Sequence, residues 1–238
     1  MTELVFRDDP YVKEVEARLL AVNDRGGLIF DRSNFYATGG GQPGDRGLLH
    51  VEGRAPIAIA TTVYDDDRRL VHVPAEPIDT PIPEGSPVRL VLDWETRYRH
   101  MRVHTSLHLL CSLVPFPVTG GQIATDGGRL DFDIPEAGVL DKAELTERLN
   151  ALIDADHPVT TRWISDAELE ANPQLVRTMA VKPPMGTGRV RLVAIGDIDL
   201  QPCGGTHVAA TREIGRVEVA KIEKKGRQNR RIRINLVE

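Results

Sequence analysis

The chain has 238 residues, a formal net charge of −5 and a hydrophobic content of 41%, which is enough for one large or two modest packed domains. No apolar run approaches the ~20 residues that cross a bilayer, and the N-terminus has no basic head followed by an apolar stretch, so neither a membrane span nor a signal peptide is expected. Two cysteines, Cys111 and Cys203, argue against a disulfide framework and favour a reducing cytoplasm.

Residues 4–90 predict a β-rich domain. Short β-prone runs, separated by turn sequences, occur at residues 28–30, 48–51, 57–63 and 70–73. Residues 11–22 are compatible with a helix or a strand, and in this context we interpret them as a strand. The alternating residues 88–93 are the strand expected to close the set. Several short strands with frequent turns predict a small barrel.

A glycine-rich segment lies inside this region, at residues 33–47. Five of the nine residues from Gly39 to Gly47 are glycine, and Gly39, Gly40 and Gly41 are successive. Such a run lets the backbone approach another surface closely and exposes its N–H groups. No Gly-Lys-Ser/Thr follows, so the segment is not a nucleotide-binding P-loop. The alternative is a tight barrel loop with no binding role.

Residues 74–87 hold five of the sixteen prolines. This density predicts a semi-rigid connector, the end of which is a reasonable domain boundary. We therefore expect one domain at residues 1–90 and a second at residues 91–238.

The second half predicts an α+β domain. Asp93 is a candidate N-cap for a helix that should run to about Val114 and stop before the prolines at 115 and 117. Helical patterns also occur at residues 142–156 and 166–172, and strand patterns at residues 118–123, 129–133, 159–164, 189–195, 217–222 and 231–237. The predicted fold class is α+β, with a small N-terminal β-barrel domain followed by an α+β domain.

Two short pairs of residues in this half could bind one metal ion. His104 and His108 stand four apart in the predicted helix, so both side chains lie on one face, with Cβ atoms roughly 5–6 Å apart. Cys203 and His207 flank a glycine pair that permits a tight turn. Three imidazoles and one thiolate are ligands of the types that bind zinc in a tetrahedral site. The two pairs raise the hypothesis of a shared metal.

The role of such a metal stays open. His100 and Cys111 share the helix face with His104 and His108. Residues 100–108 span roughly 12 Å, so we expect one ion to bind only His104 and His108. His100 is then a polar contact and Cys111 a buried small hydrophobe. The His-Glu-x-x-His pattern of zinc proteases is absent. Four protein ligands are typical of a structural site, whereas catalysis needs an open position.

The acidic balance of the chain is an objection to nucleic-acid binding, but basic residues cluster near the C-terminus. Residues 221–233 contain seven basic residues against Glu223 alone. A local patch of this kind can bind phosphate although the whole molecule is acidic. The alternative is a solvated strand edge protected by charge.

Three motifs together resemble one family. They are the glycine-rich segment at residues 35–47, the helical histidine pair at residues 104–108 and the Cys-Gly-Gly-Thr-His sequence at residues 203–207. In this order, over nearly the whole chain, they are similar to the AlaX family of stand-alone alanyl-tRNA editing proteins and to the editing domain of alanyl-tRNA synthetase. The glycine-rich segment distinguishes the alanyl from the threonyl branch. The length resembles the medium, two-domain type that acts in trans.

The resemblance implies an aminoacyl-tRNA hydrolase that acts in the cytoplasm. Its expected substrate is tRNA(Ala) mischarged with serine, with glycine as a second candidate. A synthetase pocket sized for alanine cannot strongly reject either amino acid, so a second site is needed. Zn²⁺ would be the cofactor, bound by His104, His108, Cys203 and His207. No side chain is an evident general base, and the expected nucleophile is a zinc-associated water.

Further positions are candidate substrate contacts. Thr38, beside Gly39, Gly40 and Gly41, is a candidate to bind the serine hydroxyl, and Gln122 to contact the substrate carbonyl or ribose. Each has an ordinary alternative, as a turn residue and a strand-end polar group. The expected tRNA-backbone contacts are Lys224, Lys225 and Arg227.

Two other functions remain compatible with the sequence. One is a non-catalytic, zinc-stabilised tRNA-binding module, and the other is a metallohydrolase of small molecules.

Overall fold

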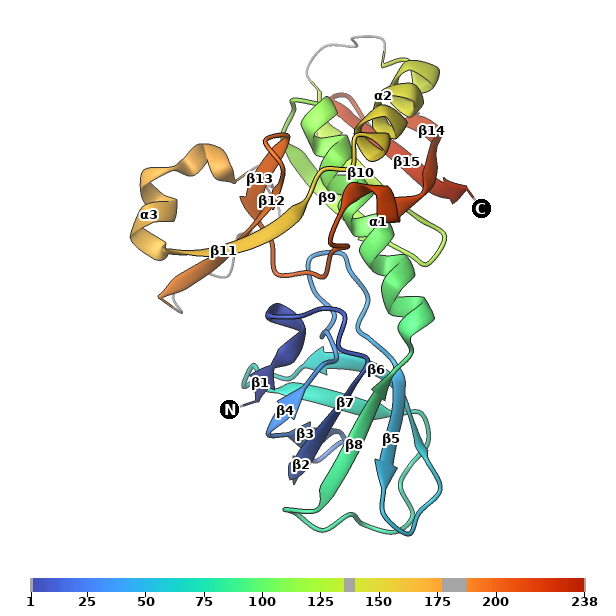
Figure 1. The fold of residues 1–238 in the computed structure, drawn as a ribbon, viewed down its shortest axis with the longest axis vertical. Coiled ribbons are helices and arrows are strands. Elements are labelled where there is room, and N and C mark those ends of the chain that lie inside the picture. Colours follow the sequence, from blue (N-terminus) through green and yellow to red (C-terminus); the bar gives the residue numbers. More distant parts are fainter. Residues whose placement is uncertain (1, 135–139, 177–187, 238) are drawn as a thin grey trace. The chain divides into compact units, whose positions relative to one another are not determined.

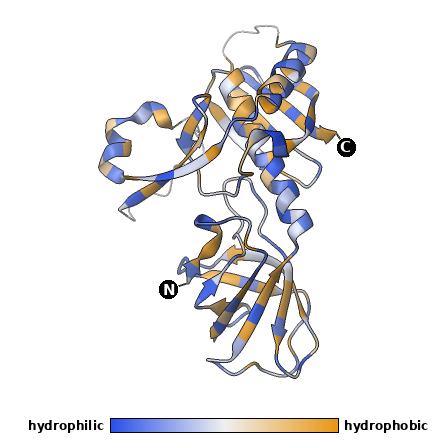
Figure 2. Cartoon of the chain, in the orientation of Figure 1, coloured by the Kyte–Doolittle hydropathy of each residue, from blue (hydrophilic) through white to orange (hydrophobic). Residues whose placement is uncertain are grey.

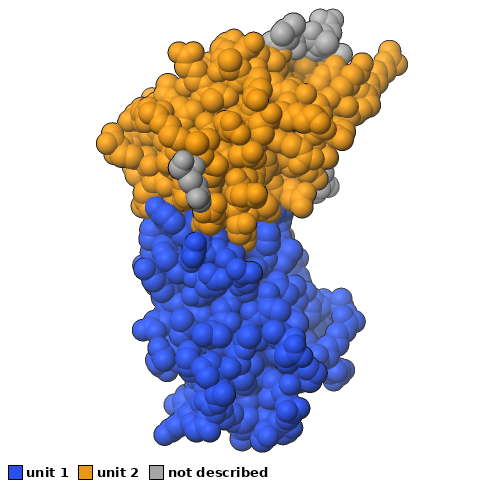
Figure 3. Space-filling view, turned by 90° about the vertical axis from the view of Figure 1, so that its right-hand side faces the viewer, with its two compact units in different colours: residues 1–98 blue, residues 99–238 orange. Residues whose placement is uncertain are grey.

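The computed structural model describes residues 2–134, 140–176 and 188–237 (Figure 1). The chain divides into two compact units, residues 1–98 and 99–238, which Figure 3 shows in separate colours. None of the helices in these ranges is both long enough and apolar enough to span a membrane.

The first unit is built on a closed six-stranded barrel, which confirms the predicted small barrel. The strands neighbour one another in the order β2-β3-β7-β6-β5-β8. Their bounds are β2 (Glu14–Val22), β3 (Leu28–Phe30), β5 (Gly47–Val51), β6 (Ile57–Tyr64), β7 (Leu70–Pro74) and β8 (Pro87–Leu92). As expected, β8 closes the set, because it pairs with both β2 and β5. Beside the barrel lie β1 (Glu3–Leu4), the 3₁₀ turn η1 (Val5–Arg7) and β4 (Arg32–Ser33).

Period-two alternation explains the barrel core. Along β2, residues Val15, Ala17 and Leu19 are buried while their neighbours face solvent. Successive side chains of a strand point to opposite faces, so one face fills the barrel. Figure 2 shows hydrophobic and hydrophilic residues interleaved along the barrel strands.

The predicted connector at residues 74–87 lies within the barrel unit. Residues 75–86 join β7 to β8, two strands of the same barrel. Proline cannot donate to a strand ladder, so the segment forms a long loop within the barrel unit. Arg54 holds this loop, since its two terminal nitrogens donate to the carbonyls of Thr80 (2.5 Å) and Pro81 (2.8 Å).

The second unit is α+β. A four-stranded sheet has the order β14-β15-β10-β9, and a three-stranded sheet has the order β11-β12-β13. The strands are β9 (Val118–Ile123), β10 (Gly127–Asp133), β11 (Val159–Ser165), β12 (Arg189–Ile195), β13 (Asp199–Pro202), β14 (Arg216–Lys224) and β15 (Asn229–Val237). The helical elements are α2 (Lys142–Asp154), α3 (Asp166–Ala171) and the 3₁₀ turns η2 (Pro173–Leu175) and η3 (Thr211–Ile214).

Helix α1 (Trp94–Leu113) follows the predicted course. Asp93 Oδ1 accepts a hydrogen bond from the Thr96 N–H at 3.2 Å, which matches its expected role as N-cap. The helix ends two residues before Pro115. Its residues 94–98 belong to the first unit and the remainder to the second. From Met101 to Cys111, ten of the eleven residues are buried, so this part of α1 is a core helix.

The strand β13 was not among the predicted elements. It has four residues, ends in a proline and pairs only with β12, at the edge of its sheet. Such a strand is too short for its alternation to be recognised. Asp199 and Gln201 are nevertheless buried on one face of it, directly before Cys203.

Candidate metal centre

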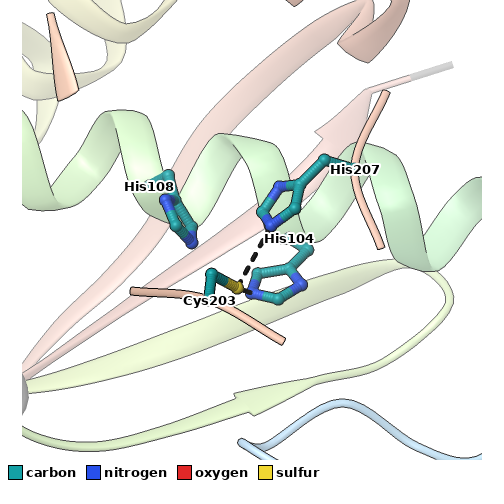
Figure 4. Close-up of side chains that lie close together, drawn as sticks. All are labelled: His104, His108, Cys203 and His207. Atoms are coloured by element: carbon teal, nitrogen blue, oxygen red, sulfur yellow. Dashed lines mark hydrogen bonds between the residues drawn. The ribbon is translucent and has the colours of Figure 1, made fainter. Parts of the chain in front are cut away.

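Four predicted ligands lie together in the second unit. His104 and His108 project from successive turns of α1, and Cys203 and His207 lie in the loop that follows β13 (Figure 4). Each residue offers one ligand atom, and these atoms all lie within 4.8 Å of one another. The helix pair meets the loop pair although Cys203 and His104 are 99 positions apart.

The imidazoles of His104 and His207 direct the same ring atom at the thiol. Cys203 Sγ lies 3.5 Å from His104 Nε2 and 3.3 Å from His207 Nε2. The ring centroids of these two histidines are 4.2 Å apart. The sulfur also accepts the N–H of Gly205 at 3.4 Å. The thiol and two Nε2 atoms therefore face a common centre.

Thr105 sets the tautomer of His207. Its hydroxyl donates to the Met101 carbonyl at 3.0 Å, as is usual for threonine within a helix. The Oγ1 atom can then only accept from His207 Nδ1, which lies 3.1 Å away. Nδ1 must carry the proton, so Nε2 presents its lone pair to the cluster. The N–H of Val208 is the second donor to the same oxygen, at 3.3 Å.

Asp199 orients His108 in a comparable way. His108 Nδ1 lies 2.9 Å from Asp199 Oδ2, and the Gln201 amide donates to that same oxygen at 2.8 Å. A carboxylate on the outer nitrogen of a histidine fixes the ring and raises its basicity as a metal ligand. The arrangement leaves His108 Nε2 for the cluster.

The charges of the cluster are those of a site built for a cation. Burial disfavours the charged imidazole of His108, but Asp199 and the Cys203 sulfur outweigh it and raise the pKa of His108 to about 10. Burial opposes ionisation of Cys203, yet His104 and His207 hold the pKa of that thiol well below its usual value. Burial, with the charge of His104, lowers the pKa of His207 well below its ordinary value.

The donor set fits zinc. It combines three imidazole nitrogens with one thiolate, and among the described residues no carboxylate belongs to this cluster. Metal ligands bind as thiolate and neutral imidazole, so a cation bound here would compensate the negative charge of the thiolate. Four such ligands can complete a tetrahedral shell.

Sequence reasoning did not identify Thr105, Asp199 and Gln201 as members of this site. Thr105 lies between His104 and His108. Nothing in the sequence distinguishes it there from a helix residue with no role at the site. The alternation Asp199-x-Gln201-x-Cys203 was the available indication, because residues at i, i+2 and i+4 of a strand share a face. His100 and Cys111 are buried on α1 but are not members of the four-residue cluster.

The glycine-rich loop belongs to the first unit and lies between β4 and β5. Gly39 and Gln42 exchange two backbone hydrogen bonds, of 3.1 and 2.9 Å. Gly40 and Gly41 have φ values of +57° and +84°, which a residue with a side chain rarely adopts. A Cβ on Gly44 would lie 2.0 Å from the Thr62 carbonyl oxygen, so this glycine permits close approach of two chain segments.

Thr38 takes part in this loop's own hydrogen bonding. Its hydroxyl accepts the Gly44 N–H at 2.9 Å and donates to the Thr62 carbonyl at 3.3 Å. A hydroxyl has one donor and two acceptor positions. These two hydrogen bonds therefore use one of the two acceptor positions of the Thr38 hydroxyl.

The other predicted contacts are exposed residues of the second unit. Gln122 lies on the edge strand β9, and its Oε1 accepts from Arg129 Nε at 3.2 Å. Lys224 ends β14, and Lys225 and Arg227 lie in the turn between β14 and β15. Lys225 Nζ is 3.7 Å from Glu223.

Comparisons with known proteins agree with this arrangement. Residues 190–233, which include Cys203 and His207, match the family model described as the threonyl and alanyl tRNA synthetase second additional domain. The alanyl-tRNA editing protein AlaX-M of Methanosarcina acetivorans is 33% identical, with 100% of both chains covered. AlaX-L of Pyrococcus horikoshii is 34% identical over 98% of this chain and 57% of its own length. An alanine–tRNA ligase of Pyrobaculum arsenaticum is 32% identical over 94% of this chain and 25% of the ligase.

The matched family model defines the class as a protein with the second additional domain of threonyl and alanyl tRNA synthetases, here in an α+β unit that holds the His₃Cys cluster. The full-length similarity is more specific. The chain belongs to the AlaX family of alanyl-tRNA editing proteins.

Proposed function

We propose that this protein is a zinc-dependent hydrolase that removes serine from mischarged tRNA(Ala) in trans, with glycine-charged tRNA(Ala) as a second substrate. The observation that carries the proposal is the convergence of His104, His108, Cys203 and His207 within 4.8 Å in a chain of this family. Two relatives that match this chain over their full length are named alanyl-tRNA editing proteins. We place its action in the cytoplasm, since neither of its two cysteines is in a disulfide.

Within this proposal, bound zinc would supply a Lewis acid for the ester carbonyl or for the attacking water. The chain's own contribution is orientation. Thr105 keeps the proton of His207 on Nδ1, and Asp199 holds Nδ1 of His108, so both Nε2 atoms stay directed at the cluster. Attack of water on the ester carbon breaks the bond to the ribose oxygen, which takes up a proton. We assign no side chain as general base and infer that the neighbouring ribose hydroxyl assists.

The decisive experiment compares release of the amino acid from tRNA(Ala) charged with serine, glycine or alanine. We expect multiple turnovers with the serine and glycine esters and little release of alanine. Chelation of the metal or Cys203→Ala should reduce the rate by at least about two orders of magnitude, because one ligand and its charge are lost. Cys111→Ala is the matched control and should retain the activity.

Two outcomes would reject the proposal in different ways. Unchanged rates in a folded, metal-free protein would exclude a catalytic metal. Tight tRNA binding without turnover by the zinc-loaded protein would favour a non-catalytic, zinc-stabilised module, to which four protein ligands are suited.

We further propose that Thr38 selects serine over alanine through the acceptor position that its loop leaves open. Thr38→Val removes that acceptor and should reduce the ratio of serine to alanine release by roughly 5- to 30-fold, since a hydrogen bond of this kind is worth about 1–2 kcal/mol. Thr38→Ser keeps the hydroxyl and is the control. If both variants discriminate as well as the natural protein, another residue reads the substrate.

A further inference from the structure

A buried arginine contacts the ligand loop at three points. Arg191 lies on β12 and is 5% exposed. Its Nη1 donates to the carbonyls of both Cys203 and Gly205, each at 3.0 Å. Its own carbonyl accepts the Cys203 N–H at 3.1 Å. Both polar main-chain groups of the thiol ligand are thus bound to this one residue.

The strand register brings the arginine to this place. Leu192 of β12 pairs with Pro202, the last residue of β13. The next residue along the chain is Cys203, and the bond from its N–H to Arg191 continues the ladder one step beyond the strand. From that point two glycines follow, which have more backbone freedom to lose than other residues. Contacts outside the ladder must therefore define the loop.

Burial of the Arg191 guanidinium strongly favours one conformation of the Cys203–His207 loop. Taking a charge out of water costs several kcal/mol unless hydrogen bonds replace its hydration. The Cys203 and Gly205 carbonyls supply two of those bonds. A loop that turned either carbonyl away would break a charge-assisted hydrogen bond at a buried group.

The same conformation directs the sulfur. With its carbonyl on Arg191, Gly205 uses its N–H to donate to Cys203 Sγ at 3.4 Å. That sulfur lies 3.5 Å from His104 Nε2. The loop is therefore held with its thiol facing the imidazoles of α1.

We propose that Arg191 is the positioning residue of the metal centre, which holds the Cys203–His207 loop ready to bind a cation. The inference rests on the metal site of the proposed function and not on its substrate. It does not require Arg191 to touch either the metal or the aminoacyl group.

An opposing effect makes the inference testable. A positive guanidinium repels a nearby divalent cation, so charge alone would make the protein bind zinc more tightly once Arg191 is neutralised. Positioning predicts the reverse. The sign of the change in zinc affinity therefore decides which effect dominates.

The experiment measures zinc affinity by competition with a chromophoric chelator for the natural protein, Arg191→Met and Arg191→Lys. We expect Arg191→Met to bind zinc about 10–100-fold more weakly, the usual cost of removing a residue that orients a ligand. Arg191→Lys keeps the charge and some donors, and should fall between. Arg189→Met is the matched control, because Arg189 lies on the same strand, exposed, with its guanidinium 4.5 Å from the Trp163 ring, and should not change the affinity.

Each result has one reading. Equal or tighter zinc binding by Arg191→Met overturns the inference. If that variant does not fold by circular dichroism, Arg191→Lys decides, and affinity equal to that of the natural protein overturns the inference. Zinc binding without deacylation by the natural protein would reject the proposed function and leave the role of Arg191 intact.

Discussion

The histidines of this chain show how surroundings decide the chemistry of one residue type. His207 and His108 each have Nδ1 bound to a neighbour and Nε2 directed at a thiol-containing cluster. His72 is equally buried, but in the barrel, between the rings of Phe30 and Phe35. Its Nδ1 faces the Leu28 carbonyl at 3.3 Å, so Nδ1 carries a proton, and its Nε2 lies 2.8 Å from Ser33 Oγ. Burial disfavours a second proton on His72 and outweighs the hydrogen bond to Leu28, which favours it.

At this scale we predict a pH dependence of stability. Burial is the main cause that lowers the pKa of His72 from 6.5 to about 4. Below pH 6.5 the folded state then binds fewer protons than the unfolded state. The contribution of neutral His72 to the free energy of unfolding is therefore fully present above pH 6.5 and is lost as the pH falls toward 4. The loss amounts to about 3 kcal/mol over that range, at about 1.4 kcal/mol per pH unit.

The measurement is urea unfolding of the natural protein and of His72→Gln at several pH values between about 7 and 4, the range in which the histidine titrates. Other groups titrate in both proteins, so the difference between the two curves isolates His72. Stability curves that run parallel over this range would contradict the prediction.

At the scale of elements, a buried ion pair ties the glycine-rich loop to the start of α1 within the first unit. Arg97 Nε donates to both carboxylate oxygens of Asp45, at 3.0 and 2.9 Å, and neither side chain is exposed to solvent by more than 1%. Arg97 Nη2 also donates to the Asn34 carbonyl at 2.7 Å. The Asp45 carboxylate in turn accepts the Tyr36 N–H at 2.5 Å. The loop conformation thus depends on a residue of the helix.

We therefore predict that Arg97→Met destabilises the protein by about 3–5 kcal/mol, because it leaves a buried carboxylate without its partner. Arg89→Met is the control. Arg89 pairs with Glu14 at 2.8 Å, but the two side chains are 43% and 59% exposed, so the change should cost at most about 1 kcal/mol. Denaturant midpoints of both variants provide the comparison, and similar midpoints would be the contrary result.

At the scale of the whole molecule, net charge and local charge differ in sign. The chain carries −5 overall, whereas residues 221–233 are strongly basic. Part of that excess is neutralised within the sheet, since Glu223 pairs with Arg233 at 3.0 Å and with Lys221 at 3.1 Å. Lys224 and Arg227 lie beyond these pairs, at the exposed end of the β14–β15 hairpin. This hairpin end is the basic surface that we propose for the tRNA backbone.

The corresponding prediction concerns salt. Lys224→Gln, Lys225→Gln and Arg227→Gln should each weaken tRNA binding and lower the slope of log affinity against log salt by about 0.7–0.9 for every phosphate that the variant no longer neutralises. Lys142→Gln, at the start of α2, is a matched control that should leave the slope unchanged. Binding isotherms between about 50 and 200 mM salt give these slopes. Slopes equal to that of the natural protein in all three variants would place the tRNA elsewhere.

Local pattern determined much of the architecture. The β-prone run at residues 57–63 and the alternation along residues 88–93 predicted barrel strands, and these residues lie in β6 and β8. The i, i+4 spacing of His104 and His108 predicted their shared face on α1. Proline density at residues 74–87 predicted a connector, but the pairing of the two strands that it joins depends on the tertiary structure.

What the amino-acid sequence determined by itself was therefore the identity of the local pairs. Helical spacing joins His104 to His108, and a glycine turn joins Cys203 to His207. Only the tertiary structure decided that the two pairs meet, which ring nitrogens face the thiol, and that Asp199 and Arg191 hold the ligands in place. These contacts depend on packing between distant segments. Residue spacing can indicate that Asp199 and Cys203 share a face of one strand, but not which distant segment that face contacts.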